Sequence, residues 1–270
     1  MSNATRFIGD IPTHYDSGLG PVIFAGFAED LAARAAALHP RNVLELAAGT
    51  GIVTRQLRDQ LPNDSSLTAT DLNQPMLDVA RSKFREDEMV TFSPADAMSL
   101  DFPDASFDVI VCQFGVMFFP DKSATYREAM RVLKPGGTYL FNVWGSLDEN
   151  PYARIGQGLA EEIFSADPPQ FYKVPFSYWE PNGVLADLRS AGCDDCTVTT
   201  LSRRQRIPDV AAFTRGFVYG NPIIAEIEAR GTVPAERVRE RLEARYLEAF
   251  GPEPLHMPLV AHVFAVKRPA

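Results

Sequence analysis

The chain has 270 residues and a formal net charge of −9. That length suits one large α/β domain, or one domain carrying a smaller insertion, and 46 % hydrophobic residues is enough for a proper core. The longest strongly apolar run, 109–112, is far too short to span a membrane. The acidic balance argues against nucleic acid as a partner, because phosphate binding depends on clustered Lys and Arg.

The three cysteines are Cys112, Cys193 and Cys196, which do not suggest a disulfide framework. Cys193-x-x-Cys196 lacks a second Cys or His pair at ligand spacing, so we expect reduced thiols and no metal site. The N-terminus shows no basic segment followed by an apolar one, and we therefore expect a cytoplasmic protein.

The first half of the chain alternates between apolar patterns typical of strands and of helices. Apolar residues at helical spacing predict a helix over 24–38. The following segments are predicted, in order, as a strand at 43–47, a helix at 52–61, and strands at 67–71, 89–93 and 107–112. A further helix, starting near Asn73 with Pro75 in its first turn, follows the second of these strands. The near-continuous apolar run of 107–112 is typical of a parallel strand covered on both faces.

A helix through Tyr126 and Leu133 comes next, and Lys134-Pro135-Gly136-Gly137 is predicted to stop it before a fifth strand at 138–143. After Trp144 the rhythm changes. The remaining segments are predicted as helices at 155–164 and 184–191, a mostly helical block at 208–250, and closing strands at 196–202 and 259–266. This alternation predicts a doubly wound α/β fold with a mostly parallel, seven-stranded sheet.

The stretch from Val43 to Gly51 is the most informative for function. A glycine turn between a parallel strand and a helix lets backbone approach a ligand and directs free N–H groups at polar or anionic atoms. Asp71 ends the next strand, where a carboxylate can accept hydrogen bonds from both hydroxyls of a ribose. These two features alone would also suit a dinucleotide enzyme.

Three further features separate these possibilities. Glu45 lies inside the first strand, and Ala95-Asp96-Ala97 follows the third. The strand at 107–112 is followed, past a helix, by Arg131-Val132-Leu133-Lys134-Pro135-Gly136-Gly137. In this order and spacing the chain resembles the class I S-adenosylmethionine-dependent methyltransferases, which have a Rossmann-like fold. The likeness is dense from about Val43 to Trp144, and is closest to the branch that acts on quinones and other small molecules.

The resemblance implies S-adenosyl-L-methionine as cofactor and S-adenosyl-L-homocysteine as product. It places the cofactor-binding positions of the family on Tyr15, Glu45, Ala47, Gly49, Gly51, Asp71, Leu72, Asp96, Ala97 and Gln113. Ala47 departs from the glycine pattern of the family. Because its Cβ disfavours positive φ, we expect a less strained first turn here than in relatives with glycine.

The resemblance also suggests a domain organisation. Residues 1–23, which include Tyr15, would form a lid over the cofactor, and 24–270 the methyltransferase domain. Inserts at about 145–180 and 208–250 would cap the site of a small-molecule acceptor. The Arg203-Arg204-x-Arg206 cluster could recognise an acidic acceptor, although a solvated surface is the simpler interpretation.

Methyl transfer from a sulfonium is an in-line displacement that can depend mainly on proximity and orientation, so the sequence marks no strong catalytic residue. The candidates for a base are His14 and Tyr15 in the lid and Tyr172 or Tyr178 in the insert. An apolar acceptor wall could come from Phe114, Met117, Trp144, Phe171, Tyr172 and Trp179, all of which could instead be core.

Two alternatives to a methyltransferase remain. One is a non-catalytic protein that binds S-adenosylmethionine, since this chemistry needs no distinctive side chain. The other is an NAD-dependent oxidoreductase, which is disfavoured because Thr54 stands where the dinucleotide motif needs its third glycine. The sequence fixes neither the acceptor atom nor the oligomeric state.

Overall fold

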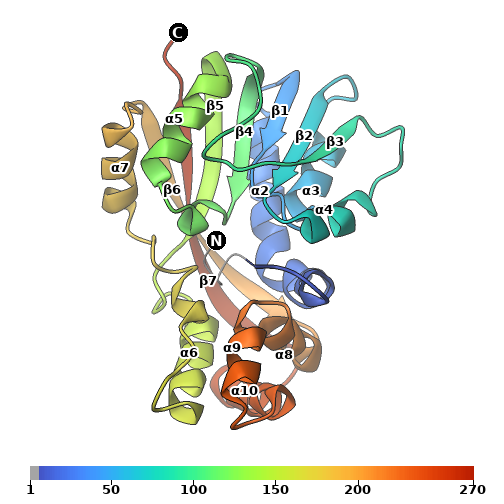
Figure 1. Cartoon of the computed structure of the whole chain (residues 1–270), viewed down its shortest axis with the longest axis vertical. Coiled ribbons are helices and arrows are strands. Elements are labelled where there is room, and N and C mark those ends of the chain that lie inside the picture. Colours follow the sequence, from blue (N-terminus) through green and yellow to red (C-terminus); the bar gives the residue numbers. More distant parts are fainter. Residues whose placement is uncertain (1–5) are drawn as a thin grey trace.

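The computed structural model describes residues 6–270, so the first five residues of the predicted lid lie outside the described part. The predicted seven-stranded sheet runs through the molecule, and its strand order is β3-β2-β1-β4-β5-β7-β6 (Figure 1). The strands are β1 (Asn42–Glu45), β2 (Ser66–Asp71), β3 (Val90–Pro94), β4 (Phe107–Gln113), β5 (Leu133–Trp144), β6 (Cys196–Ile207) and β7 (Leu255–Lys267). Strands β1 to β5 pair in parallel, whereas β7 is antiparallel to both of its neighbours.

Helices cover both faces of the parallel part. They are α2 (Ala25–Ala36), α3 (Ile52–Gln60), α4 (Gln74–Arg81), α5 (Lys122–Val132) and α7 (Pro181–Ser190). Val109 and Val111 of β4 pack in one apolar cluster with α2 and α3, while Ile110 and Cys112 pack in the other with α5 and α7. This arrangement confirms the prediction of a strand covered on both sides.

The remaining helices gather at one end of the molecule, below the sheet in Figure 1. They are α6 (Pro151–Ile163), α8 (Val210–Tyr219), α9 (Ile223–Arg230) and α10 (Ala235–Phe250). The strands β6 and β7 extend towards them and are longer than predicted, pairing as far as Ile207 with Leu255. The polar run Arg203-Arg204-Gln205-Arg206 lacks the apolar alternation of a half-buried strand, which is why the pattern missed this extension. No helix among residues 6–270 has the length and hydrophobicity of a membrane span.

The N-terminal segment is helical well before Phe24, where the sequence pattern begins. A short helix, α1 (Ile11–His14), continues into the π-helical segment η2 (Tyr15–Phe24). This segment crosses between the sheet and the lower helices, and it packs on α8 at two glycines. A Cβ on Gly18 would lie only 2.6 Å from the Cα of Gly216.

The predicted stop at Lys134–Gly137 ends α5 but does not precede the strand. Leu133 already pairs with Phe107, and Thr138 pairs with Val109, so the four residues between form an irregularity inside β5. Gly136 lies there at φ +75°, a conformation that glycine adopts without a Cβ clash. The expected strand at 138–143 therefore begins too late.

Candidate functional site

The candidate site lies where the strand order reverses. β1 lies between β2 and β4, and their carboxyl ends bring Glu45, Asp71 and Gln113 to one edge of the sheet. In open α/β sheets this switch point forms a crevice that binds ligands. Residues that are distant in sequence are thus brought together as the sequence predicts.

The loop after β1 takes the conformation that its glycines allow. Gly49 has φ +56° and Gly51 φ +80°, both in the left-handed region. A Cβ on Gly51 would lie 2.8 Å from the Cβ of Ala80, so this position also needs glycine for packing against α4. The N-terminus of α3 follows at once, and its first N–H groups have no partner within the helix and no side-chain cap.

Asp71 ties this loop to the end of β2. Its Oδ2 accepts from the Gly49 amide at 2.9 Å, and its Oδ1 accepts from the Asn73 amide at 2.8 Å. Burial raises the pKa of Asp71, and these backbone hydrogen bonds oppose the shift by favouring the carboxylate. Asp71 therefore positions the glycine loop in addition to the ribose-binding role that the resemblance implies.

The conformation of Ala47 contradicts the expectation of a less strained turn at this position. It adopts φ +52°, so the turn is as left-handed as glycine would make it. The Cβ of Ala47 is accommodated by the missing side chain of Gly115, on which a Cβ would approach that of Ala47 to 2.6 Å. The tertiary contact overrides the local preference, at a cost of roughly 1–2 kcal/mol for a non-glycine residue in this region.

We therefore expect Gly115→Ala to destabilise the chain by about 1–3 kcal/mol, as overpacking does. The new methyl group would meet the Cβ of Ala47 and, at 2.7 Å, the Sγ of Cys112. Adding Ala47→Gly should recover part of the loss, and chemical unfolding of the two single variants and the double variant measures this coupling. Strictly additive effects would contradict the contact.

Glu45 is buried at the end of β1, and its Oε2 has no hydrogen-bond partner among the described residues. Burial raises its pKa to about 8, and the nearby carboxylate of Asp71 contributes to the shift. Glu45 lines a cavity of about 30 Å³ together with Tyr15, Phe24 and Gln113. A buried carboxyl group with a free oxygen is suited to receiving a cation in this cavity.

The positions predicted for the adenine end are more open. Leu72 is 44 % exposed, while Ala97 is buried. Asp96 is exposed, and its Oδ1 accepts from the Met98 amide at 2.9 Å, so it caps its own turn and keeps the other oxygen for a ligand. The structure thus places these residues at the ends of β2 and β3, close to the loop after β1.

Sequence reasoning missed Asn142, which is fully buried in β5. Its Oδ1 accepts from the Phe114 amide at 2.9 Å, and its Nδ2 donates to Gln113 at 3.4 Å. Phe114 has φ +50°, so Asn142 holds a strained residue directly after β4. A polar residue inside the apolar run Tyr139–Trp144 is the signal that could have identified it.

A second cavity, of about 60 Å³, lies beside the first and is mainly aromatic. It is lined by Phe7, Tyr15, Leu19, Ile23, Phe24, Phe114, Phe118, Trp144, Tyr152, Phe171, Tyr172, Pro175, Phe176, Phe217 and Asn221. Phe114 and Trp144 stack with centroids 3.8 Å apart. Tyr15 and Phe24 line both cavities, so the two ring systems form the partition between them.

This lining includes four of the six residues of the predicted acceptor wall. Trp179 does not belong to it, because it is 43 % exposed on the loop before α7. Met117 is buried in the core beside the cavity without lining it. The spacing of aromatic residues in the insert could not distinguish rings that line the cavity from rings that are exposed, because both show the same local pattern.

The four candidate bases are placed differently. The Tyr172 hydroxyl donates to the Phe217 carbonyl, and the Tyr178 hydroxyl bonds to Asp187 at 2.7 Å, so both are already engaged. His14 packs against Tyr219 and lines neither cavity. Tyr15 lies at the partition, where burial and the charges of Asp71 and Asp16 raise its pKa and keep it protonated.

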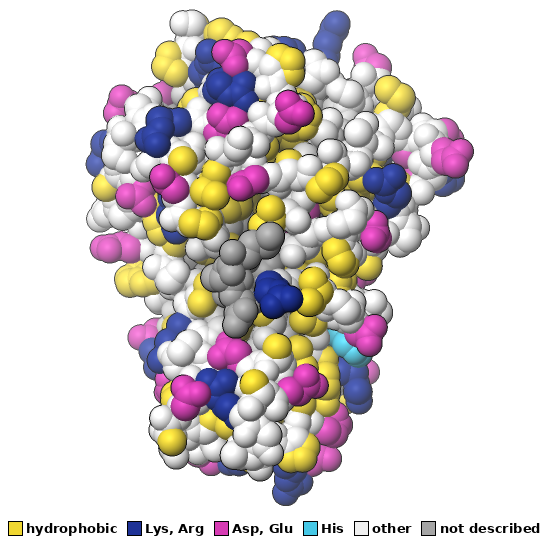
Figure 2. Space-filling model, viewed as in Figure 1, with side chains coloured by type: hydrophobic (Ala, Val, Ile, Leu, Met, Phe, Trp, Pro, Cys, Tyr) yellow, Lys and Arg dark blue, Asp and Glu magenta, His cyan; other side chains and the backbone are white. Residues whose placement is uncertain are grey.

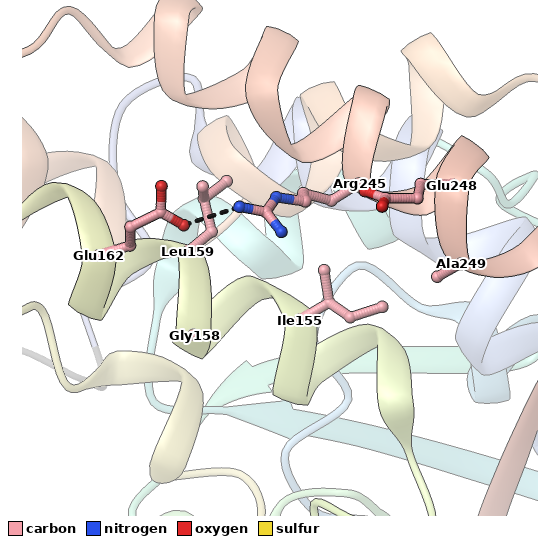
Figure 3. Close-up of a pocket in the computed structure, with 7 residues that line it drawn as sticks. All are labelled: Ile155, Gly158, Leu159, Glu162, Arg245, Glu248 and Ala249. Atoms are coloured by element: carbon pink, nitrogen blue, oxygen red, sulfur yellow. Dashed lines mark hydrogen bonds and ion pairs between the residues drawn. The ribbon is translucent and has the colours of Figure 1, made fainter.

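A larger cavity, of about 480 Å³, lies elsewhere, between α6 and α10 (Figure 3). Glu162 of α6 and Arg245 of α10 point towards each other across it and form an ion pair at 2.8 Å. None of its lining residues belongs to the strand ends or the glycine loop. We therefore locate the candidate site at the switch point rather than in this groove.

The cluster Arg203-Arg204-x-Arg206 lies on β6, where the Arg203 guanidinium packs over Phe27.

Comparison with known proteins agrees with this geometry. A family model described as a methyltransferase domain matches residues 44–141. The demethylmenaquinone methyltransferase of Deinococcus radiodurans is 39 % identical over 113 residues, which are 42 % of this chain and 46 % of that protein. The ubiquinone/menaquinone biosynthesis C-methyltransferase UbiE of Shewanella woodyi is 40 % identical over 102 residues, covering 37 % and 41 %. The chain thus spans less than half the length of these relatives.

Solved structures share the fold over most of the chain. The YcgJ protein of Bacillus subtilis has a TM-score of 0.57 at 20 % identity, covering 91 % of this chain and 99 % of that one. The phosphoethanolamine N-methyltransferase 2 of Haemonchus contortus, solved with S-adenosyl-L-methionine, has a TM-score of 0.59 at 18 % identity, covering 96 % and 57 %. Residues 44–141, from β1 to β5, match the methyltransferase domain family, and the chain shares its overall fold with these solved structures.

Proposed function

We propose that this protein transfers a methyl group from S-adenosyl-L-methionine to a small apolar acceptor and releases S-adenosyl-L-homocysteine. The observation that carries the proposal is the pair of adjoining cavities, one bounded by the glycine loop and the other aromatic, with Tyr15 and Phe24 between them. Two adjoining cavities suit a reaction in which the cofactor and the acceptor must come into contact.

The residues of the first cavity fit the cofactor. The N–H groups at the start of α3 and the free oxygen of Glu45 would receive the charged methionine end, and Asp71 the ribose. Leu72, Asp96 and Ala97 would border the adenine, and Gln113 the methionine end. This cavity is small, about 30 Å³, and we expect Tyr15 and Phe24 to move when the cofactor binds. This supports the assignment of residues 6–23 as a lid.

The bound cofactor would supply a methyl group on a positively charged sulfur, a good leaving group. The chain's own contribution is then to align the acceptor and exclude water, which can account for a large part of the rate. The stacked pair of Phe114 and Trp144 offers a rigid aromatic surface to an acceptor ring. The names of the relatives favour a quinone-type acceptor.

The surface supports a small-molecule acceptor over nucleic acid. On the face in Figure 2, acidic and basic side chains are interspersed, and the chain carries 35 acidic against 26 basic residues. The helices α6 and α8 contribute to the surroundings of the aromatic cavity through Tyr152 and Phe217, which supports the proposed capping role of the two inserts.

Thermal unfolding with S-adenosylmethionine, S-adenosylhomocysteine and NAD in parallel tests the cofactor. At about 100 times its dissociation constant, a true ligand adds about 2.7 kcal/mol, which shifts the melting temperature by several degrees. We expect a shift with both adenosyl ligands and none with NAD. A shift with NAD alone would overturn the proposal in favour of an oxidoreductase. Cofactor binding without turnover on a panel of hydroquinones and phenols would favour a non-catalytic role.

Because of Glu45, we expect the affinity for the cofactor to depend on pH. Its pKa of about 8 in the folded protein lies above the usual value of 4.5, so the carboxyl is protonated at neutral pH and must lose that proton to pair with a cation. We expect affinity to rise by up to about tenfold per pH unit between pH 6 and 8 and then level off. Calorimetry in buffers of different ionisation enthalpy should show proton release, and the Glu45→Gln variant should show none.

The raised pKa of Glu45 should also make the stability of the cofactor-free protein depend on pH, in the opposite direction to the affinity for the cofactor. Because the folded state holds a proton that the unfolded state has lost, the free energy of unfolding should fall as the pH rises from about 4.5 through about 8. Cofactor-free Glu45→Gln should lack this contribution. A dependence of binding that is flat in pH for the unsubstituted chain would contradict the buried, protonated state.

A further inference from the structure

β6 forms an open edge of the sheet (Figure 1). It pairs with β7 along its whole length, and no strand within residues 6–270 pairs with its other side. The four consecutive residues from Thr197 to Thr200 are all exposed, and Val198 alone is 40 % exposed. Natural edge strands are usually protected by proline, a bulge or an inward charge, and residues 196–202 contain none of these.

The hydrogen bonds of β7 define which residues of β6 face the open side. The Lys267 amide donates to the Asp195 carbonyl at 2.9 Å, so Asp195 is a hydrogen-bonded position of the antiparallel pair. By alternation, Thr197 and Thr199 also direct their backbone groups at β7. Val198 and Thr200 therefore direct their N–H and C=O groups outward, where an added strand could pair with them.

A second copy of this strand can pair with the edge in antiparallel orientation, in registers that differ by two residues. If Thr199 lies on a two-fold axis, Val198 of one copy lies opposite Thr200 of the other, and their outward backbone groups hydrogen-bond. The same register brings Arg204 of one copy near Asp194 of the other, which lies two residues before the start of β6, at both ends of the paired segment. Both side chains are exposed, and directly opposite residues lie on the same face of a sheet.

We propose that two copies of this chain associate through antiparallel pairing of β6 with β6, which joins their sheets into one across a two-fold axis. The edge is self-complementary, as a two-fold interface requires, because its acidic end and its basic end meet reversed in the second copy. A shift of the register by one residue would turn the outward groups away from one another. Registers two residues apart satisfy the backbone equally, and the charges of Asp194 and Arg204 favour the one centred on Thr199.

Sedimentation equilibrium of the full chain should show a dimer. The deciding variant is Val198→Pro, because it removes an N–H that points away from β7 and leaves the ladder within the chain intact. We expect it to be monomeric, with an unchanged melting transition at low concentration. Val198→Ala keeps the N–H and should remain a dimer. A monomeric unsubstituted chain, or a Val198→Pro variant that dimerises equally well, would overturn the proposal.

Charge reversal tests the register. Arg204→Asp and Asp194→Arg should each weaken self-association, since every interface then opposes like charges at both ends. An equimolar mixture of the two variants should associate again, because each contact then joins opposite charges. Failure of the mixture to associate would overturn this register. These measurements do not depend on the cofactor, so they stand or fall separately from the proposed enzymatic activity.

Discussion

Asp71→Ala should weaken S-adenosylmethionine binding by about 100-fold or more, equivalent to about 2.7 kcal/mol. The substitution removes the carboxylate proposed to bind the ribose, and it also releases the Gly49 amide that Asp71 holds at 2.9 Å. Hydrogen bonds to charged groups contribute roughly 1.5–3 kcal/mol each, so the two losses together account for an effect of this size. Isothermal titration calorimetry well below the melting temperature measures it.

Two further variants separate binding from loop structure. Asp71→Asn keeps a carbonyl acceptor for the Asn73 amide but loses the charge, so we expect an intermediate loss of about tenfold. Asp78→Ala removes an exposed carboxylate from α4 and should bind the cofactor as the unsubstituted chain does. If Asp71→Ala folds and its dissociation constant does not change, Asp71 belongs to the structure of the loop only.

Gly216→Ala should lower the free energy of unfolding by about 1–3 kcal/mol. A methyl group at this position would lie 2.7 Å from the Cα of Gly18, so η2 and α8 would have to move apart. In an ordinary exposed helix the same change stabilises, by roughly 0.5–1 kcal/mol, which makes the expected sign diagnostic. Chemical denaturation and limited proteolysis of the N-terminal segment report on the two consequences.

Gly158→Ala is the matched control for this prediction. Gly158 also lies within a helix of the cap, but a Cβ there has no neighbour within 4 Å. We therefore expect Gly158→Ala to melt at or above the temperature of the unsubstituted chain. If Gly216→Ala behaves in the same way, the close contact between η2 and α8 is wrong.

The sequence predicted the sheet and the arrangement of the central elements because their periodicities are strong. Val43–Gly51 and 107–112 combine a buried strand with a glycine turn or a paired helix, and both lie where expected. The extension of β6 was not predictable from its pattern, since the polar run from Arg203 to Arg206 has no apolar alternation and its strand conformation comes from pairing with β7. Lys134–Gly137 was placed outside β5 because a proline and two glycines are typical of a turn.

In the candidate site, too, the sequence could locate some residues and could not locate others. Glu45, Asp71 and the loop glycines occupy backbone positions set by the fold, so motif spacing located them. The conformation of Ala47 depends on the space left by Gly115, and no local rule contains that contact. The aromatic cavity combines rings from six separate segments, so the sequence could nominate Phe114 and Trp144 but could not exclude Trp179.

The partition formed by Tyr15 and Phe24 has a thermodynamic consequence. A ligand that displaces these rings from one cavity changes the volume and shape of its neighbour, so the two binding equilibria cannot be independent. By linkage, whatever factor the cofactor contributes to acceptor affinity, the acceptor must return to cofactor affinity. If the cofactor and the acceptor bind as proposed, the two stacked rings, 5.0 Å apart, would couple their binding within a single chain.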